Sequence, residues 1–551
     1  MNGVTQHEFF LTDNGLALAA TCFAPRAPRA AVLMIPPFAE ERKGALPVFV
    51  QAARALASAD IAALLFDFPG CGDSEGEFDA LPPERFDRAC ETAWSWLAAA
   101  FPDAPRAILG ARTGATLATR LAAARSDAAA LALWAPVAGP DFVRQLLQRR
   151  MVNDMVAYGK ARESRASLDA RLRAGETVDL DGYPISGPFY AWLQQATPVS
   201  AACPVFLASG GHDEKTAAAC AAPHAEVTRT PLRFPPFWNT VGHVDLTALI
   251  SETAGWLQAR IAVGPSAPMP AFPEPPASSI SEQVSFGNEG QTVRAVWDIP
   301  HGAPRNGVLF LHGWSGDRTG PHRLFVRFAR ALAAQGSLCL RPDFFGRGVS
   351  DGDAADASIA RMAVDAQTAL NALRRRLPPG APVAVVAICS GCKVAITLAA
   401  DTPDLERLLL WSAESMGSLR AASTGLRKTL GALTAYAKKL TRPETWKKII
   451  SGKVRTDLVT KALVKHETRS ADEARAEDGV LKRFRSFRRP ILFVFGGSDP
   501  DAVGSSRAYA DYCRKNGIPF SLHTVAHAGH SYYGEAWTRE LLDVSQRFFR
   551  T

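Results

Sequence analysis

The chain has 551 residues, of which 47% are hydrophobic and 21% are charged. This is the composition of a soluble globular protein, and the length exceeds one ordinary core, so we expect two domains of about 250 residues each. Residues 1–10 lack a basic patch followed by an apolar run, and no stretch approaches the roughly 18 apolar residues of a membrane span, so we expect a cytoplasmic protein without membrane insertion.

The net charge of +8 is concentrated in one part of the chain. Residues 414–489 contain 19 Lys/Arg against 8 Asp/Glu, a net charge of +11 that leaves the rest slightly acidic at −3. Such a segment attracts phosphates, acidic sugars or an anionic membrane surface, or it is only a solvated helical face. No nucleic-acid-binding motif accompanies it, so we expect no nucleic-acid partner.

The first half opens with an extended stretch at 10–23, an apolar strand at 31–35 and a helical pattern at 48–59. Residues 110–114 (GARTG) then have the spacing of a nucleophile elbow, but the central residue is Arg112. A guanidinium stays protonated and cannot attack a carbonyl. We therefore expect a degenerate first domain, with a lid insertion at about 142–198.

Asp213, two positions after Gly211, and His243, directly after Gly242, lie late in the first half, where an acid and a base would stand. Three interpretations stay open. The domain is structural or regulatory, or Arg112 at a helix N-terminus binds a carboxylate or phosphate beside Asp213 and His243, or these two groups retain catalysis with water. His243 could equally be an ordinary partly buried histidine.

Residues 264–276 read GPSAPMPAFPEPP, and their prolines forbid a helix and favour an extended spacer. We therefore place a linker at 264–279, between a domain at 1–263 and a domain at 280–551.

The second half repeats the pattern of the first, with an apolar strand at 307–311 and a helical pattern at 324–334. Asp343 lies 276 positions after Asp67, and the two elbow centres lie 277 positions apart. The near-constant offset indicates a tandem duplication. Strands alternating with helical patterns predict the α/β class, with two mostly parallel, doubly wound sheets.

The second elbow, residues 387–391 (AICSG), carries Cys389 at its centre. A strand-to-helix turn would hold this thiol above the sheet edge, and a neighbouring imidazole and the helix N-terminus would favour its thiolate. Ser390 is the alternative nucleophile, but it would put the bulky Ile388 at a small position of the turn. Cys389 and Cys392 also form a C-x-x-C pair, for which a redox role is the rival interpretation.

The acid and the base should follow the nucleophile in chain order. Asp499 follows one strand pattern and His530 follows the next. We predict that Asp499 orients His530, and that His530 takes the proton of Cys389 and passes it to the leaving group. Asp501 and His527 are the competitors for these two roles.

The oxyanion hole should combine two backbone N–H groups, those of Trp314 and Ser390. Trp314 lies in the loop after the strand at 307–311, and we expect His312 in that loop to be structural. The basic insertion at about 419–489 should form the second lid. The nine cysteines show no disulfide-scaffold or zinc-site spacing, and no phosphate-binding glycine loop occurs, so we expect a reducing compartment and no metal or cofactor.

These motifs resemble the α/β-hydrolase superfamily in both halves, across nearly the whole chain. In the first half, PPFAEERK at 36–43 resembles the type 2 hydrolase associated with exosortase A systems. In the second, GWSGDRTGPHR at 313–323 with the cysteine elbow resembles the type 1 hydrolase of those systems. The resemblance implies bacteria that make exopolysaccharide and sort proteins to the envelope. The elbow is also similar to those of dienelactone hydrolases and polyhydroxyalkanoate synthases, which use cysteine in this fold.

Together the patterns predict a hydrolase of ester or thioester bonds that acts through Cys389, His530 and Asp499 in the second domain. The partner would be a small-molecule acyl substrate, and the basic lid favours an anionic one. An acyltransferase with the same three residues is one alternative, and a non-enzymatic scaffold of two degenerate domains is the other. The sequence does not indicate an oligomeric state.

Overall fold

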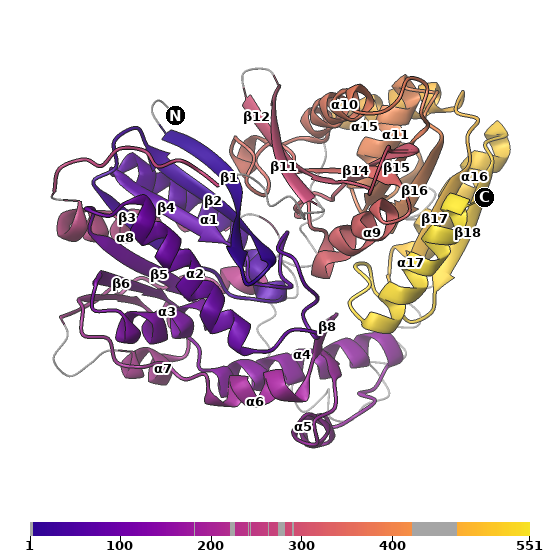
Figure 1. Cartoon of the computed structure of the whole chain (residues 1–551). Helices are drawn as coiled ribbons and strands as arrows, with labels where there is room; N and C mark the ends of the chain where they lie inside the picture. Colours follow the sequence, from indigo (N-terminus) through magenta and orange to yellow (C-terminus); the bar gives the residue numbers. More distant parts are fainter. Residues whose placement is uncertain are drawn as a thin grey trace.

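The computed structural model describes residues 4–180, 182–220, 226–240, 242, 244–262, 264–273, 281–288, 291–420 and 471–550. Each half of the chain forms its own eight-stranded sheet (Figure 1). The fold is therefore two tandem α/β domains, as the sequence predicts. Within the described ranges, no helix is both long and apolar enough to cross a membrane.

The two sheets have the same strand order when their strands are matched by position. In spatial order, the first contains β1 (Val4–Asp13), β2 (Leu16–Pro25), β4 (Ile61–Phe66), β3 (Ala30–Ile35), β5 (Arg106–Ala111), β6 (Ala128–Trp134), β9 (Val205–Ala208) and β10 (Val227–Arg229). The second contains β11 (Ser281–Asn288), β12 (Gln291–Asp298), β14 (Ser337–Pro342), β13 (Asn306–Leu311), β15 (Val383–Ile388), β16 (Arg407–Trp411), β17 (Ile491–Gly496) and β18 (Phe520–Val525). β2 and β12 pair antiparallel with both of their neighbours, and the remaining pairs in each sheet are parallel.

Helices cover both faces of each sheet, and this is why the central strands are continuous apolar runs. The first domain places α2 (Glu84–Ala100), α3 (Thr113–Ala124) and α7 (Glu214–Ala219) on one face, and α1 (Glu40–Ser58) and α8 (Thr247–Ile261) on the other. The second places α10 (Ile359–Arg375), α11 (Gly391–Asp401), α15 (Ala471–Phe484) and α16 (Ala502–Asn516) on one face, and α9 (Leu324–Ala333) and α17 (Glu535–Arg550) on the other.

The insertion between β6 and β9 lies where the sequence predicts the first lid. It contains α4 (Gly139–Tyr158), α5 (Arg165–Arg173), the hairpin β7 (Val178–Leu180) and β8 (Tyr183–Ile185), and α6 (Gly187–Gln195). Helix α4 reaches the second domain, where the carbonyl of Ala157 accepts a hydrogen bond from Ser498 Oγ at 3.2 Å (Figure 1). The predicted basic lid lies mostly outside the described residues, and α15 is its described helix.

The two domains contact each other through matched residues of the two halves. Arg54 on α1 donates to the carbonyl of Ser350 at 2.8 Å, and Arg330 on α9 donates to the carbonyl of Ser74 at 3.3 Å. Each arginine and each serine lies 276 positions from its counterpart. The contact thus has the reciprocal form of an isologous dimer interface, in which one patch contacts its own equivalent.

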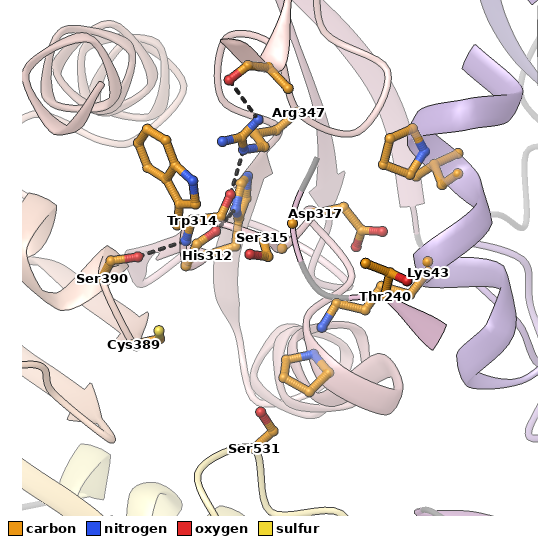
Figure 2. Close-up of a pocket in the computed structure, with 18 of the residues that line it drawn as sticks. Lys43, Thr240, His312, Trp314, Ser315, Asp317, Arg347, Cys389, Ser390 and Ser531 are labelled. Carbon is orange, nitrogen blue, oxygen red and sulfur yellow. Dashed lines mark hydrogen bonds between the residues drawn. The ribbon is translucent and has the colours of Figure 1, made fainter. Parts of the chain in front are cut away.

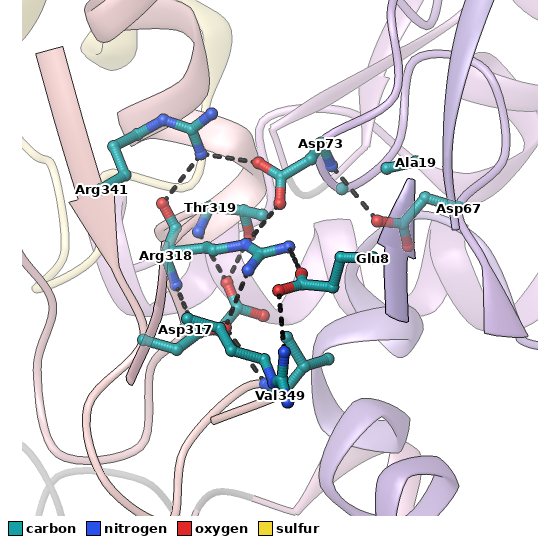
Figure 3. A network of polar contacts seen from close by, with 12 residues as sticks. Glu8, Ala19, Asp67, Asp73, Asp317, Arg318, Thr319, Arg341 and Val349 are labelled. Atoms are coloured by element: carbon teal, nitrogen blue, oxygen red, sulfur yellow. Dashed lines mark hydrogen bonds and ion pairs between the residues drawn. The ribbon is translucent and has the colours of Figure 1, made fainter. Parts of the chain in front are cut away.

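A buried ionic network completes this interface (Figure 3). Asp73 of the first domain pairs with Arg318 and Arg341 of the second, each at 2.7 Å. Arg42 of the first domain pairs with Asp317 of the second at 2.8 Å. All five side chains are buried, so the two domains are joined by charges removed from water.

Candidate active site

Cys389 lies at the turn between β15 and α11. Its backbone φ of 59° is positive, which is rare for a residue other than glycine. The turn requires small neighbours, because a Cβ on Gly391 would lie 2.3 Å from the Leu311 carbonyl oxygen and one on Gly313 would lie 2.9 Å from the Cys389 Cβ. The backbone therefore presents the thiol above the sheet edge. Cys389 is partly exposed and lines a cavity.

The predicted base and acid meet beside this thiol. His530 Nδ1 lies 2.8 Å from Asp499 Oδ2, and Asp499 is buried at the end of β17. Burial alone would lower the pKa of His530, but its hydrogen bonds with Asp499 and Cys389 raise that pKa to about 11. The structure thus brings Cys389, His530 and Asp499 together, with the imidazolium form of the histidine favoured.

The competing residues lie elsewhere. His527 packs at a tilt against the ring of Tyr158 of the first domain, with ring centroids 4.7 Å apart. Asp501 immediately precedes α16, and its backbone N–H donates to Asp499 Oδ1 at 3.1 Å. His312 is buried, its Nε2 accepts from the Phe344 N–H at 3.2 Å, and burial lowers its pKa to about 4. These contacts fit a structural role for His312.

The loop after β13 lies against the elbow (Figure 2). The Trp314 N–H, one of the two predicted oxyanion donors, donates to Ser390 Oγ at 2.7 Å. The Ser390 hydroxyl therefore holds the place that a substrate oxygen would take at this donor. Arg347 stacks over the Trp314 ring at 4.7 Å and hydrogen-bonds its carbonyl, so it fixes the loop from the other side.

Glu414 belongs to the site but was not among the sequence-predicted residues. Its Oε1 accepts a hydrogen bond from Cys389 Sγ at 3.1 Å, and its Oε2 lies 2.9 Å from Nζ of the buried Lys393. Burial would raise the pKa of Glu414, but Lys393 and the Cys389 thiol lower it, so the carboxylate is charged. A signal existed, because Glu414 follows β16 and carboxyl ends of parallel strands meet at the ligand-binding edge.

The first domain forms the same turn around Arg112, with a φ of 56°. The guanidinium is buried and lies 3.2 Å from both Glu41 and Asp213, and 4.1 Å from the ring of Trp238. Asp213, the predicted acid, thus pairs with the residue at the nucleophile position. An anionic ligand would have to compete with these two carboxylates for Arg112. His243 lies outside the described residues.

One cavity of about 1950 Å³ joins both elbows. The second domain contributes Trp314, Cys389 and His530 to its wall, and the first contributes Lys43 and Arg112. Drug-sized ligands occupy cavities of roughly 300–1,000 Å³, so this space can hold a substrate that touches both domains.

The comparisons with known proteins concern half of the chain at a time. Residues 308–544 match the family described as the alpha/beta hydrolase family, which supports a hydrolase of this superfamily in the second half. No curated protein matches the chain.

Several solved structures are also similar to about half of the chain. Est1E from Butyrivibrio proteoclasticus with bound ferulic acid is 17% identical, with a TM-score of 0.34 over 49% of this chain and 100% of its own. A thermostable carboxyl esterase from Bacillus coagulans is 16% identical, with a TM-score of 0.33 over 50% of this chain and 99% of its own. A dienelactone hydrolase from Anabaena variabilis is 14% identical, with a TM-score of 0.32 over 49% of this chain and 98% of its own.

Proposed function

We propose that the second domain hydrolyses ester or thioester bonds through Cys389. The thiol proton passes to His530, the resulting thiolate attacks the carbonyl carbon, and the His530 imidazolium then gives this proton to the departing alkoxide or thiolate. Water, deprotonated by His530, attacks the resulting thioester, releases the acid and returns the thiol. Esters and thioesters are favoured over amides because their leaving groups need less help from an acid.

The pairing of His530 with Asp499 beside Cys389 carries this proposal. The three residues come from separate loops at the carboxyl ends of strands, and a nucleophile with an oriented imidazole is the arrangement that acyl transfer requires. The first domain is proposed to be non-catalytic, because a guanidinium stands at its elbow. The matched sheet order and the 276-residue offset of the interface contacts support a tandem duplication as its origin.

Turnover of p-nitrophenyl butyrate tests the proposal. We expect Cys389→Ala to lose at least about a thousandfold in kcat/KM, because the covalent step disappears. Cys203→Ala is the matched control, since Cys203 is the other cysteine that is partly exposed, and it should keep its activity. Loss of activity in Ser390→Ala with activity retained in Cys389→Ala would move the nucleophile to Ser390. Full activity in both variants would contradict a hydrolase site at this elbow.

A further inference from the structure

Lys43 is a residue of the first domain that faces the nucleophile's cavity. It lies on α1 and lines the same cavity as Cys389 (Figure 2). Its positive charge acts on Asp317, which lies in the loop after β13. Burial raises the pKa of this carboxyl, but Arg42 and, with a smaller effect, Lys43 lower it, so that the pKa is lowered overall. The ammonium group therefore lies near the loop that carries the predicted oxyanion donor.

The positive charge of Lys43 is only weakly neutralised by a neighbouring carboxylate. Its Nζ lies 3.8 Å from Glu40 Oε1, which is near the limit of an ion pair. Glu40 is also engaged with the second domain, because its carboxylate accepts hydrogen bonds from Tyr533 Oη and the His322 N–H. The side chain of Lys43 is 21% exposed, so it is accessible to a ligand in the cavity.

Three of the carboxylates that line the cavity have closer cationic partners than Lys43 has an anionic one. Arginines or lysines pair with them at 2.8 Å for Asp317, 2.9 Å for Glu414 and 3.2 Å for Asp213. On the opposite wall, Arg347 donates to main-chain carbonyls, and no ion pair is present between it and a carboxylate within the described ranges. Lys43 and Arg347 are thus two of the cations on the cavity wall, which also contains the carboxylates of Glu40, Glu473 and Glu477.

We propose that Lys43 is a specificity-determining residue that binds an anionic group, a carboxylate or a phosphate, on the acyl substrate of Cys389. This inference rests on the proposed function and adds a substrate class to it. An ammonium group is a compact point charge that suits either anion. The first domain would then recognise the substrate, and the second domain would carry out the reaction. This gives the first domain a role in the shared cavity although its own elbow has no nucleophile.

Two substrates of equal chain length test the inference: mono-p-nitrophenyl glutarate, which carries a terminal carboxylate, and the neutral p-nitrophenyl valerate. We expect Lys43→Gln to lower kcat/KM for the glutarate ester about tenfold or more and to change the valerate ester less than about twofold. Lys43→Arg should keep part of the preference, because it keeps the charge. Lys515→Gln removes the same charge from an exposed site on α16 and should change neither substrate.

Competition identifies the anion. Inhibition of glutarate-ester turnover by inorganic phosphate at lower concentrations than by glutarate would assign a phosphate, and the reverse order would assign a carboxylate. Equal losses for the two esters in Lys43→Gln, or no loss for either, would overturn the inference while leaving the proposed function in place.

A second readout does not need turnover. Iodoacetate and iodoacetamide differ in charge but little in size, and peptide mass analysis reports their rates at Cys389. Lys43→Gln should slow iodoacetate severalfold relative to iodoacetamide. If the wild type turned over neither ester, the proposed function would fail, and an unchanged rate ratio in this variant would overturn the inference separately.

Discussion

The Cys389 thiol lies between two groups of opposite charge. The His530 imidazolium interacts with the sulfur on one side, and on the other the Glu414 carboxylate accepts a hydrogen bond from it at 3.1 Å. Lys393 offsets the negative charge of this carboxylate by pairing with it at 2.9 Å. The reactivity of the sulfur therefore depends on charges contributed by three side chains.

Asp499→Asn tests the orientation and charge of the base. Removal of the carboxylate takes away the main contribution that raises the pKa of His530, so the imidazolium should lose its proton at a lower pH. Because the imidazolium protonates the leaving group, we expect the alkaline limb of the kcat/KM profile to move to lower pH. The rate at neutral pH should fall by roughly a hundredfold or more.

The raised pKa of His530 also predicts how the stability of the protein depends on pH. A raised pKa means that the pair stabilises the fold fully below the ordinary histidine pKa near 6.5, and that this contribution is lost as the pH rises toward about 11. Asp499→Asn should flatten the decline between these values in denaturant titrations. Asp501→Asn is the control, and an identical pH profile in both variants would contradict the assignment of Asp499.

Chain order made Cys389, Asp499 and His530 predictable, because each follows a strand pattern and the fold requires them in this sequence. Glu414 and Lys393 were not predictable in the same way. Glu414 has no fixed spacing from the elbow, and Lys393 is a buried lysine whose partner only the tertiary structure shows. The engagement of the Trp314 N–H by Ser390 Oγ likewise depends on how two loops pack.

The elbow is the element that the two domains share most closely. Arg112 and Cys389 have φ values of 56° and 59°, although one is a buried cation and the other a thiol. Both turns are followed by a glycine, Gly114 or Gly391, whose added Cβ would lie within 2.3 Å of a carbonyl oxygen. The geometry therefore persists where the chemistry differs, because helix and strand pack too closely here for a larger residue.

Gly391→Ala should damage this element. The added Cβ would overlap the Leu311 carbonyl, so the turn must shift, and we expect a loss of roughly 2 kcal/mol or more in unfolding free energy together with a fall in esterase activity. Gly255→Ala is the control, because Gly255 lies within α8 with open space around its Cβ position. That variant should gain about 0.5–1 kcal/mol. Equal effects of both variants in thermal and chemical unfolding would contradict the packing argument.

The alternating strand and helix patterns were sufficient to predict the two sheets, because parallel strands buried on both faces are apolar throughout. The same patterns could not predict the contact between the two domains. Arg318, Arg341 and Asp73 are charged residues that a sequence pattern assigns to the surface, yet each is at least nine-tenths buried in the interface.

The domains are held in one orientation by this network, and the cavity depends on that orientation because both of them line it. Arg318 contacts Glu8 and Asp73 of the first domain, both at 2.7 Å. Buried charges are costly unless they are paired, so a shifted or separated arrangement would leave arginines without partners. The two domains should therefore unfold together.

Asp73→Asn tests this coupling. Burial would raise the pKa of Asp73, but Arg341 and Arg318 hold it far below its usual range, so the carboxylate is charged at neutral pH and its contribution is lost only in strongly acidic solution. Neutralising one member of a buried network costs roughly 3–5 kcal/mol, and we expect this loss in denaturant unfolding together with two separate transitions. Asp511→Asn removes an exposed carboxylate that pairs with Arg514, and it should change stability by less than about 0.5 kcal/mol. A single unshifted transition in Asp73→Asn would show that the domains are held together by something other than these charges.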